Sequence, residues 1–177
     1  LDGIQLLNEP AFNKYTSATL PKLKELIGQC RNKVVARLEV YRWIVFNTMV
    51  GNSDAHLKNI SFLVDHEGKR VAPFYDLLCT AVYHTRAYSD VDAVWPAEKL
   101  ASPIAGATHF CDVTYQKLID TGIELGLNKA TAAREVAKIV GKMKDAAEEI
   151  ETELEAAMRD PDRPHGVPGP ATMGAES

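Results

Sequence analysis

The 177-residue sequence contains no run of about 18 apolar residues and no basic stretch followed by an apolar one near its N-terminus. Aromatic residues make up only 7% of the chain. The chain contains 20 Lys and Arg residues and 24 Asp and Glu residues. The resulting net charge of −4 argues against direct contact with nucleic acid, which usually needs a basic face. We therefore expect a cytoplasmic protein with neither membrane nor nucleic acid as a direct partner.

Cysteine is also scarce, and the three thiols of Cys30, Cys79 and Cys111 form no CxxC pair. Three widely spaced cysteines do not make a disulfide framework, so reduced thiols are expected, as in the cytoplasm. The five histidines, at positions 56, 66, 84, 109 and 165, lack ligand spacing such as H-x-x-x-H. A metal-dependent hydrolase is therefore the least favoured class.

In other respects the composition of the chain is that of a globular protein, with 46% hydrophobic and 25% charged residues. We assign residues 1–158 to one domain. Residues 160–177 hold four prolines and three glycines and little that is apolar. The expectation for residues 159–177 is therefore a disordered tail.

Apolar residues at helical spacing predict most of the structure. The predicted helices cover residues 20–27, 33–50, 113–126 and a long final segment from the N-cap Asn128 to Met158. The segment 33–50 is apolar almost all round, which predicts a buried helix. The apolar stripe of the final helix consists of Ala132, Val136, Ile139, Val140, Met143, Ile150, Leu154 and Met158.

One β-hairpin is predicted between these helices. Residues 60–64 and 69–72 have strand character and flank a turn at 65–68, and Pro73 ends the second strand. Residues 84–112 show no sustained period and are expected to be irregular. The predicted fold class is mainly α (α+β), with a short hairpin and no larger sheet.

Three polar residues around this hairpin match the requirements of phosphoryl transfer. Such a reaction needs a carboxylate to accept the proton of the attacking hydroxyl, and oxygen ligands to hold Mg²⁺ against the nucleotide phosphates. Kinases place the first carboxylate and an Mg²⁺-binding Asn in the pattern Asp-x-x-x-x-Asn, with a second Asp further along. Asp54 and Asn59 have this spacing, and Asp76 follows the predicted hairpin.

Each of these signals alone has an ordinary structural explanation. Asp-x-x-x-x-Asn recurs by chance, and the run from Asn52 to Asp54 alone is more typical of a turn or helix cap. Asp76 alone fits a surface turn, and a single histidine such as His56 is more often structural than catalytic. The order of all three residues around a hairpin makes phosphoryl transfer the better interpretation.

The segments 51–61 (GNSDAHLKNIS) and 72–78 (APFYDLL) resemble the two-part signature of the HipA-like serine/threonine kinases. Asp2–Gln5 and Lys14–Tyr15 resemble the start of that family's C-terminal lobe, and the resemblance extends over residues 1–158. It implies a C-terminal lobe of a protein-kinase-like fold that uses ATP and Mg²⁺. It further implies Asp54 as the catalytic base and Asn59 and Asp76 as ligands of Mg²⁺ and nucleotide. His56 would contact the transferring phosphate, and Lys58 would act nearby.

The family's N-terminal lobe, with its phosphate-covering loop and lysine, has no counterpart ahead of Asp54, and the chain begins at Leu1 rather than Met. We therefore interpret it as an excised or processed fragment that is inactive alone. The resemblance also implies a toxin that phosphorylates a protein and is restrained by a HipB-like DNA-binding antitoxin.

Two other functions stay open from the sequence. The first is a non-catalytic module that assembles with an antitoxin or with a separate N-terminal lobe. The second is a small-molecule phosphotransferase, since such enzymes use a similar Asp–Asn–Asp set. Tyr75-Asp76 after Pro73 favours the HipA-like alternative over the second.

Overall fold

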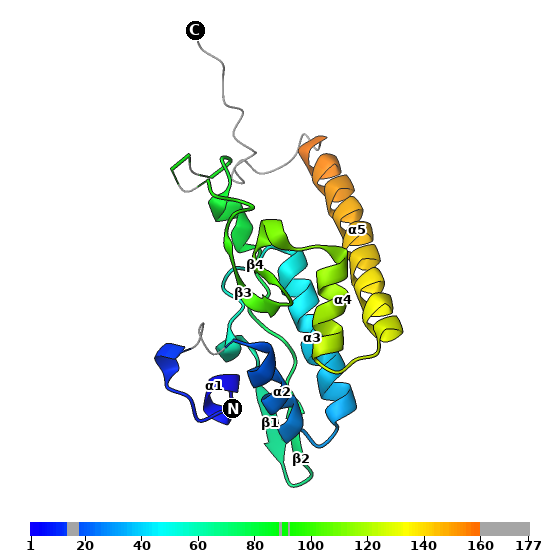
Figure 1. The fold of residues 1–177 in the computed structure, drawn as a ribbon. Coiled ribbons are helices and arrows are strands. Elements are labelled where there is room, and N and C mark those ends of the chain that lie inside the picture. The colour runs from blue at the N-terminus through cyan, green and yellow to red at the C-terminus, as the bar shows by residue number, and fades with distance from the viewer. Residues whose placement is uncertain (14–17, 89, 92, 160–177) are drawn as a thin grey trace. The chain divides into compact units, whose positions relative to one another are not determined.

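The computed structural model describes residues 1–13, 18–88, 90, 91 and 93–159. The helices are α1 (Gly3–Leu6), α2 (Leu20–Gln29), α3 (Lys33–Met49), α4 (Tyr115–Glu124) and α5 (Lys129–Arg159), joined by short 3₁₀ turns (Figure 1). The strands are β1 (Phe62–Asp65), β2 (Gly68–Val71), β3 (Lys99–Ile104) and β4 (Ala107–His109). Within the described part of the chain they form two antiparallel hairpins, so the predicted mainly α fold class is confirmed.

The chain divides into two units, Leu1–Val140 and Gly141–Ser177, with the boundary inside α5. The first unit contains the hydrophobic core, both hairpins and the first turns of α5. The described part of the second unit is the remainder of that helix, up to Arg159. The disorder predicted for residues 159–177 concerns residues that, Arg159 apart, lie outside the described chain.

Helix α3 forms the centre of the first unit and contacts α2, α4, β2 and β3. Asn32 caps its start, because its Oδ1 accepts a hydrogen bond of 3.1 Å from the backbone nitrogen of Val35. Most of the apolar side chains between Ala36 and Thr48 are buried, as predicted for residues 33–50, whereas Met49 at the end is 39% exposed. The prediction was wrong for the first turn, where Val34 is 69% exposed because the helix begins outside the core.

Three helices meet at the side chain of Tyr41 on α3. Its hydroxyl donates to the backbone oxygens of Leu118 on α4, at 2.9 Å, and Ala132 on α5, at 3.3 Å. Burial raises the pKa of this phenol, so it stays a donor. Nearby, Arg42 donates to the buried carboxylate of Glu135 at 2.7 Å, and this bond lowers the pKa of Glu135. These contacts fix α4 and the first turns of α5 against α3.

The first hairpin has the predicted position, with Phe62 paired to Val71 and Asp65 to Gly68. The second hairpin, β3–β4, contradicts the prediction that residues 84–112 are irregular. Its register is irregular, and Pro103 within β3 has no N–H to donate, so the sequence lacks a clear strand period. Contacts of β3 with α3 and α4 stabilise it instead.

Helix α1 was also missed, although its signal lies in the sequence. Asp2 accepts a hydrogen bond from the backbone of Gln5 at 2.8 Å, and Gln5 accepts one from the backbone of Asp2 at 2.9 Å. This reciprocal pair is a capping box, which marks a helix start by its three-residue spacing.

Helix α5 runs from Lys129 to Arg159 and confirms the predicted final helix. Its apolar stripe is buried only in the first turns, at Ala132 and Val136, with Ile139 partly buried against the core. The exposed members are Val140, Ile150, Leu154 and Met158. Periodicity thus identified the helix correctly but did not show which part of the stripe is buried.

Among the described residues, no helix combines the length and the apolar character that crossing a membrane requires.

The packing of α4 on α3 generates a first prediction. A Cβ on Gly122 would lie 2.7 Å from the Cβ of Ala132 and 2.9 Å from the Tyr41 ring. Gly122→Ala should therefore lower the free energy of unfolding by about 1–3 kcal/mol. Gly28 in α2 has no atom within 4 Å of such a Cβ. Gly28→Ala should instead raise stability by up to about 1 kcal/mol. Urea unfolding of both variants tests this, and equal effects would contradict it.

Candidate phosphotransfer site

Gly51 turns the chain out of α3 into the loop that contains the motif. Its φ is +70°, and a Cβ there would lie 2.6 Å from the Cβ of Ala81. Glycine alone combines this conformation with such a close approach. The Gly51 carbonyl in turn accepts a hydrogen bond of 2.9 Å from the Ala81 nitrogen, which ties the start of the loop to the following segment.

Buried apolar side chains of the loop itself anchor it to the hydrophobic core. Ala55, Leu57 and Ile60 are each at most 1% exposed. Helix α1 supports the same region, because the Gly3 nitrogen donates to the Ile60 oxygen at 2.8 Å. A Cβ on Gly3 would lie 2.7 Å from the Leu57 oxygen, so α1 contacts the 3₁₀ turn Leu57–Asn59 backbone to backbone. This packing against the core and α1 therefore holds the polar residues of the loop in fixed positions.

The side-chain amide of Asn59 joins the two segments that the motif predicts to converge. Its Nδ2 donates to Oδ2 of Asp76 at 2.9 Å and to the backbone oxygen of Asp54 at 3.1 Å. Asn59 is buried, whereas the side chain of Asp54 is 45% exposed. The structure therefore brings the three residues together, with one carboxylate turned towards solvent.

Asn52 forms a second bridge between these segments. Its Nδ2 donates to Oδ1 of Asn47 at 2.8 Å and to the backbone oxygen of Asp76 at 3.2 Å. Its Oδ1 accepts from the backbone nitrogen of Asp54 at 3.0 Å. At 2% exposure it is a buried positioning residue that holds both acidic residues by their backbones. Sequence analysis gave Asn52 no role, because the bridge to Asp76 spans 24 residues.

Thr80 and Tyr75 fix the outer sides of the site. Sequence analysis assigned neither a place in the site and used Tyr75 only to favour the HipA-like alternative. The Thr80 hydroxyl accepts from the backbone nitrogen of Ser53 at 2.7 Å and donates to the Gly51 oxygen at 3.1 Å. The Tyr75 hydroxyl donates to the backbone oxygen of Lys58. The segment after the hairpin is thus tied to both halves of the loop.

Asp76 itself has φ +56°, in the left-handed region that few residues other than glycine occupy. Aspartate tolerates this conformation better than most residues, at a small cost. The surrounding hydrogen bonds to its backbone and carboxylate hold it there. Backbone strain of this kind is common at functional sites, so the outlier supports a functional hypothesis for Asp76.

His56 and Lys58, the remaining predicted residues, differ in exposure. His56 is 6% exposed, and its Nε2 lies 3.8 Å from Oδ1 of Asp54. Lys58 is exposed on the 3₁₀ turn. The buried histidine therefore lies next to the Asp54 carboxylate, while Lys58 faces solvent on the same loop.

The donor set fits Mg²⁺ shared with a phosphate. Mg²⁺ in nucleotide sites takes one or two protein oxygen ligands and completes its shell with phosphate and water. Asp76 supplies a carboxylate and Asn59 an amide oxygen, from side chains already within hydrogen-bonding distance of each other. Among the described residues, no group of three His, Cys, Asp or Glu side chains forms a metal cage.

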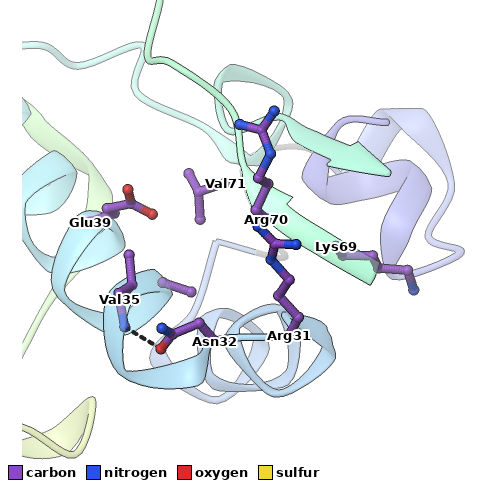
Figure 2. Close-up of a pocket in the computed structure, with 8 residues that line it drawn as sticks. Arg31, Asn32, Val35, Glu39, Lys69, Arg70 and Val71 are labelled. Carbon is purple, nitrogen blue, oxygen red and sulfur yellow. Dashed lines mark hydrogen bonds between the residues drawn. The ribbon is translucent and has the colours of Figure 1, made fainter. Parts of the chain in front are cut away.

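Figure 2 shows a separate pocket of about 280 Å³ at the start of α3. The candidate site lies at the other end of this 17-residue helix, which is about 25 Å long. It is lined by Arg31, Asn32, Val35, Ala36, Glu39, Lys69, Arg70 and Val71. Arg31 already forms an ion pair with Glu67, and Lys69 donates to Gln29 at 2.7 Å. Burial raises the pKa of Glu39. We therefore assign no anionic ligand to this pocket.

The bridging role of Asn52 is testable by stability. Asn52→Ala leaves the buried Oδ1 of Asn47 and the Asp54 nitrogen without the bonds that Asn52 supplies. The free energy of unfolding should fall by about 2 kcal/mol or more. Tyr75→Phe, which removes hydrogen bonds at an exposed position, should cost less than about 1 kcal/mol. Urea unfolding measures both, and equal costs would show that Asn52 is no special bridge.

Comparison with known proteins finds relatives that are named as kinases. The chain is 41% identical over 87 residues to "Putative kinase Y4mE" of Sinorhizobium fredii, covering 46% of this chain and 20% of that protein. It is 40% identical over 62 residues to the serine/threonine-protein kinase toxin HipA of Shewanella oneidensis, covering 35% of this chain and 14% of that protein. The chain thus spans a minor part of the relatives that it matches.

The fold is similar to that of one chain in the Shewanella oneidensis MR-1 toxin–antitoxin complex of HipA, HipB and operator DNA. The TM-score is 0.71 at 24% identity, covering 86% of this chain and 37% of that one. At this identity the likeness shows that the two chains share a fold. The family model of the HipA-like C-terminal domain matches residues 1–150. The chain therefore belongs to the family of HipA-like C-terminal domains.

Proposed function

We propose that this chain is the catalytic lobe of a serine/threonine protein kinase, which transfers the γ-phosphate of ATP to a protein hydroxyl. One observation carries the proposal: the Asn59 amide bonds both to the Asp76 carboxylate and to the Asp54 backbone. A metal-binding pair and an exposed carboxylate then stand side by side. This is the arrangement that phosphoryl transfer to a hydroxyl requires.

Asp54 acts as the base in this proposal. Its side chain is 45% exposed, so a substrate hydroxyl has access to it. Its backbone is held on both sides, by the Asn52 side chain at its nitrogen and by the Asn59 amide at its oxygen. A carboxylate on a fixed backbone can orient the hydroxyl and accept its proton without reorganisation of the loop.

In this proposal Asn59 and Asp76 would hold Mg²⁺ for a bound nucleotide. The bound ion supplies positive charge that offsets the charge developing on the transferring phosphoryl group. The segment containing Asp76 is kept in place by the Asn52 bridge and by the Tyr75 hydroxyl bond to the Lys58 backbone. The spacing between the base and the metal ligands is thereby set before substrate binds.

His56 orients Asp54 from its buried position, and Lys58 acts from the exposed side of the turn. A direct contact of His56 with the transferring phosphate fits less well, since the ring is largely covered. Lys58 is the better candidate for a charge that approaches the phosphate from solvent.

In our proposal a nucleotide-covering N-terminal lobe completes the kinase. The matched segments cover 14% of the HipA relative and 37% of the matched chain of known structure, so these 177 residues correspond to a part of such a protein. The likeness to a chain of the HipA, HipB and operator DNA complex favours a toxin with a HipB-like antitoxin as partner. Free thiols at Cys30, Cys79 and Cys111 fit a cytoplasmic protein.

The same coverage favours one alternative, a non-catalytic lobe that retains the site for assembly. This lobe would bind a separate N-terminal lobe or an antitoxin without transferring phosphate. Phosphorylation after addition of an N-terminal lobe distinguishes the alternatives, because only the catalytic lobe would then phosphorylate a protein.

Nucleotide binding by the 177-residue chain should be weak. The metal ligands are present, but the nucleotide would contact one lobe only. Calorimetric titration with ATP and Mg²⁺ should show no affinity tighter than the micromolar range, ~1 μM, and no protein phosphorylation should be detectable. Sub-micromolar binding would show that the chain holds the nucleotide by itself.

In a protein that includes the N-terminal lobe, Asp54→Asn and Asp76→Asn should each abolish phosphorylation while changing stability little. Asparagine keeps the size of each side chain, and it tolerates the left-handed backbone of residue 76. The exposed Asp145 on α5 provides the control, since Asp145→Asn should leave phosphorylation unchanged. Full activity of either site variant would overturn the proposed role of that residue.

A further inference from the structure

The exposed part of α5 has a regular apolar face. Its members are Val140, Met143, Ala147, Ile150, Leu154 and Ala157, which we call the α5 seam. They alternate by four and three residues, the spacing that keeps apolar side chains on one side of a coiled coil. Ile150 and Leu154 are each 56% exposed, far more than the buried Val136 one helical turn before the seam. The seam therefore presents apolar surface to solvent.

Charge is segregated along the same helix (Figure 1, yellow to orange). Residues 129–147 contain five basic and two acidic side chains, whereas residues 148–159 contain five acidic and one basic. The helix dipole favours acidic residues near the N-terminus and basic residues near the C-terminus, so this order runs largely against it. The stability of the single helix therefore does not explain the distribution.

We propose that the α5 seam binds the α5 seam of a second copy of this chain, with the two helices antiparallel. An antiparallel pair places the segment of each helix that contains Lys142 and Lys144 beside the segment of the other that contains Glu151, Glu153 and Glu155. A parallel pair would instead place the two acidic halves together, where like charges repel. Charge complementarity thus selects both the occupant and its direction.

The register follows from the seam residues. Opposing Ala147 to Ile150 of the second copy also brings Met143 opposite Leu154 and Val140 opposite Ala157 of that copy. Ile150 and Val140 then each oppose a small alanine side chain of the other copy, which leaves the space that interlocking packing of helices requires. The same register places Lys144 next to Glu151 of the second copy, and the two-fold axis repeats this pair.

The charges needed for this pairing are accessible. Within its own helix Lys144 lies 3.8 Å from Glu148, and these side chains are 75% and 66% exposed. Such an exposed pair is weak, so Lys144 can turn to a new partner. The seam is only about 27 Å long, so the dimer should be weak and depend on concentration.

Sedimentation equilibrium of the 177-residue chain tests the proposal. The mass should rise from the 19.5 kDa of one chain towards twice that value as concentration increases. Ile150→Glu should weaken dimerisation at least about tenfold, because it buries a charge in the seam. Thr152→Glu adds the same charge away from the seam and is the matched control. Circular dichroism verifies that both variants keep the helix.

Charge reversal tests the direction. Lys144→Glu and Glu151→Lys should each weaken the dimer, and the two together should restore it, because they recreate the pair with its signs exchanged. Parallel helices would show no restoration, since residues 144 and 151 would not face each other. The proposal is overturned by a monomer at all concentrations, by a dimer insensitive to Ile150→Glu, or by a double variant without restoration. It does not depend on the proposed kinase function, which these variants leave untouched.

Discussion

The side-chain amides of two buried asparagines hold the candidate site together. Asn59 and Asn52 each link the loop after α3 to Asp76, one through its carboxylate and the other through its backbone oxygen. Each also bonds to the backbone of Asp54. An amide offers donors and an acceptor on one small planar group, so it can join several backbone segments at once. The position of Asp54 relative to Asp76 depends on these two residues.

The amides can do this only because α3 is rigid and buried. Asn47 on its last turns accepts from Asn52, so the network begins on the central helix of the core. A buried hydrogen bond is strong when all members are satisfied and costly when one is lost. The core therefore fixes the site through polar contacts at one end of α3, while apolar packing fixes the rest of that helix.

Local patterns in the sequence predicted the features that neighbouring residues determine. Helix α3, the β1–β2 hairpin and the convergence of Asn59 with Asp76 followed from period, turn residues and motif order. The β3–β4 hairpin could not be predicted, because contacts with α3 and α4 compensate for its weak strand pattern. The bridge made by Asn52 was equally hidden, since its partners lie on three separate segments. The roles of the site residues stay predictions.

Helix α5 shows a further limit of periodicity. A single apolar stripe runs along the helix, yet Val136 packs in the core while Ile150 is exposed. Apolar periodicity predicts that one face of a helix packs against an apolar surface. It does not predict whether that surface belongs to the same chain. Charge provides the missing information, because Lys142 and Lys144 complement the acidic residues 148–155 and so indicate an antiparallel helix as the neighbour of the exposed part. The early turns then stabilise the fold, and the later turns provide a surface for a second copy.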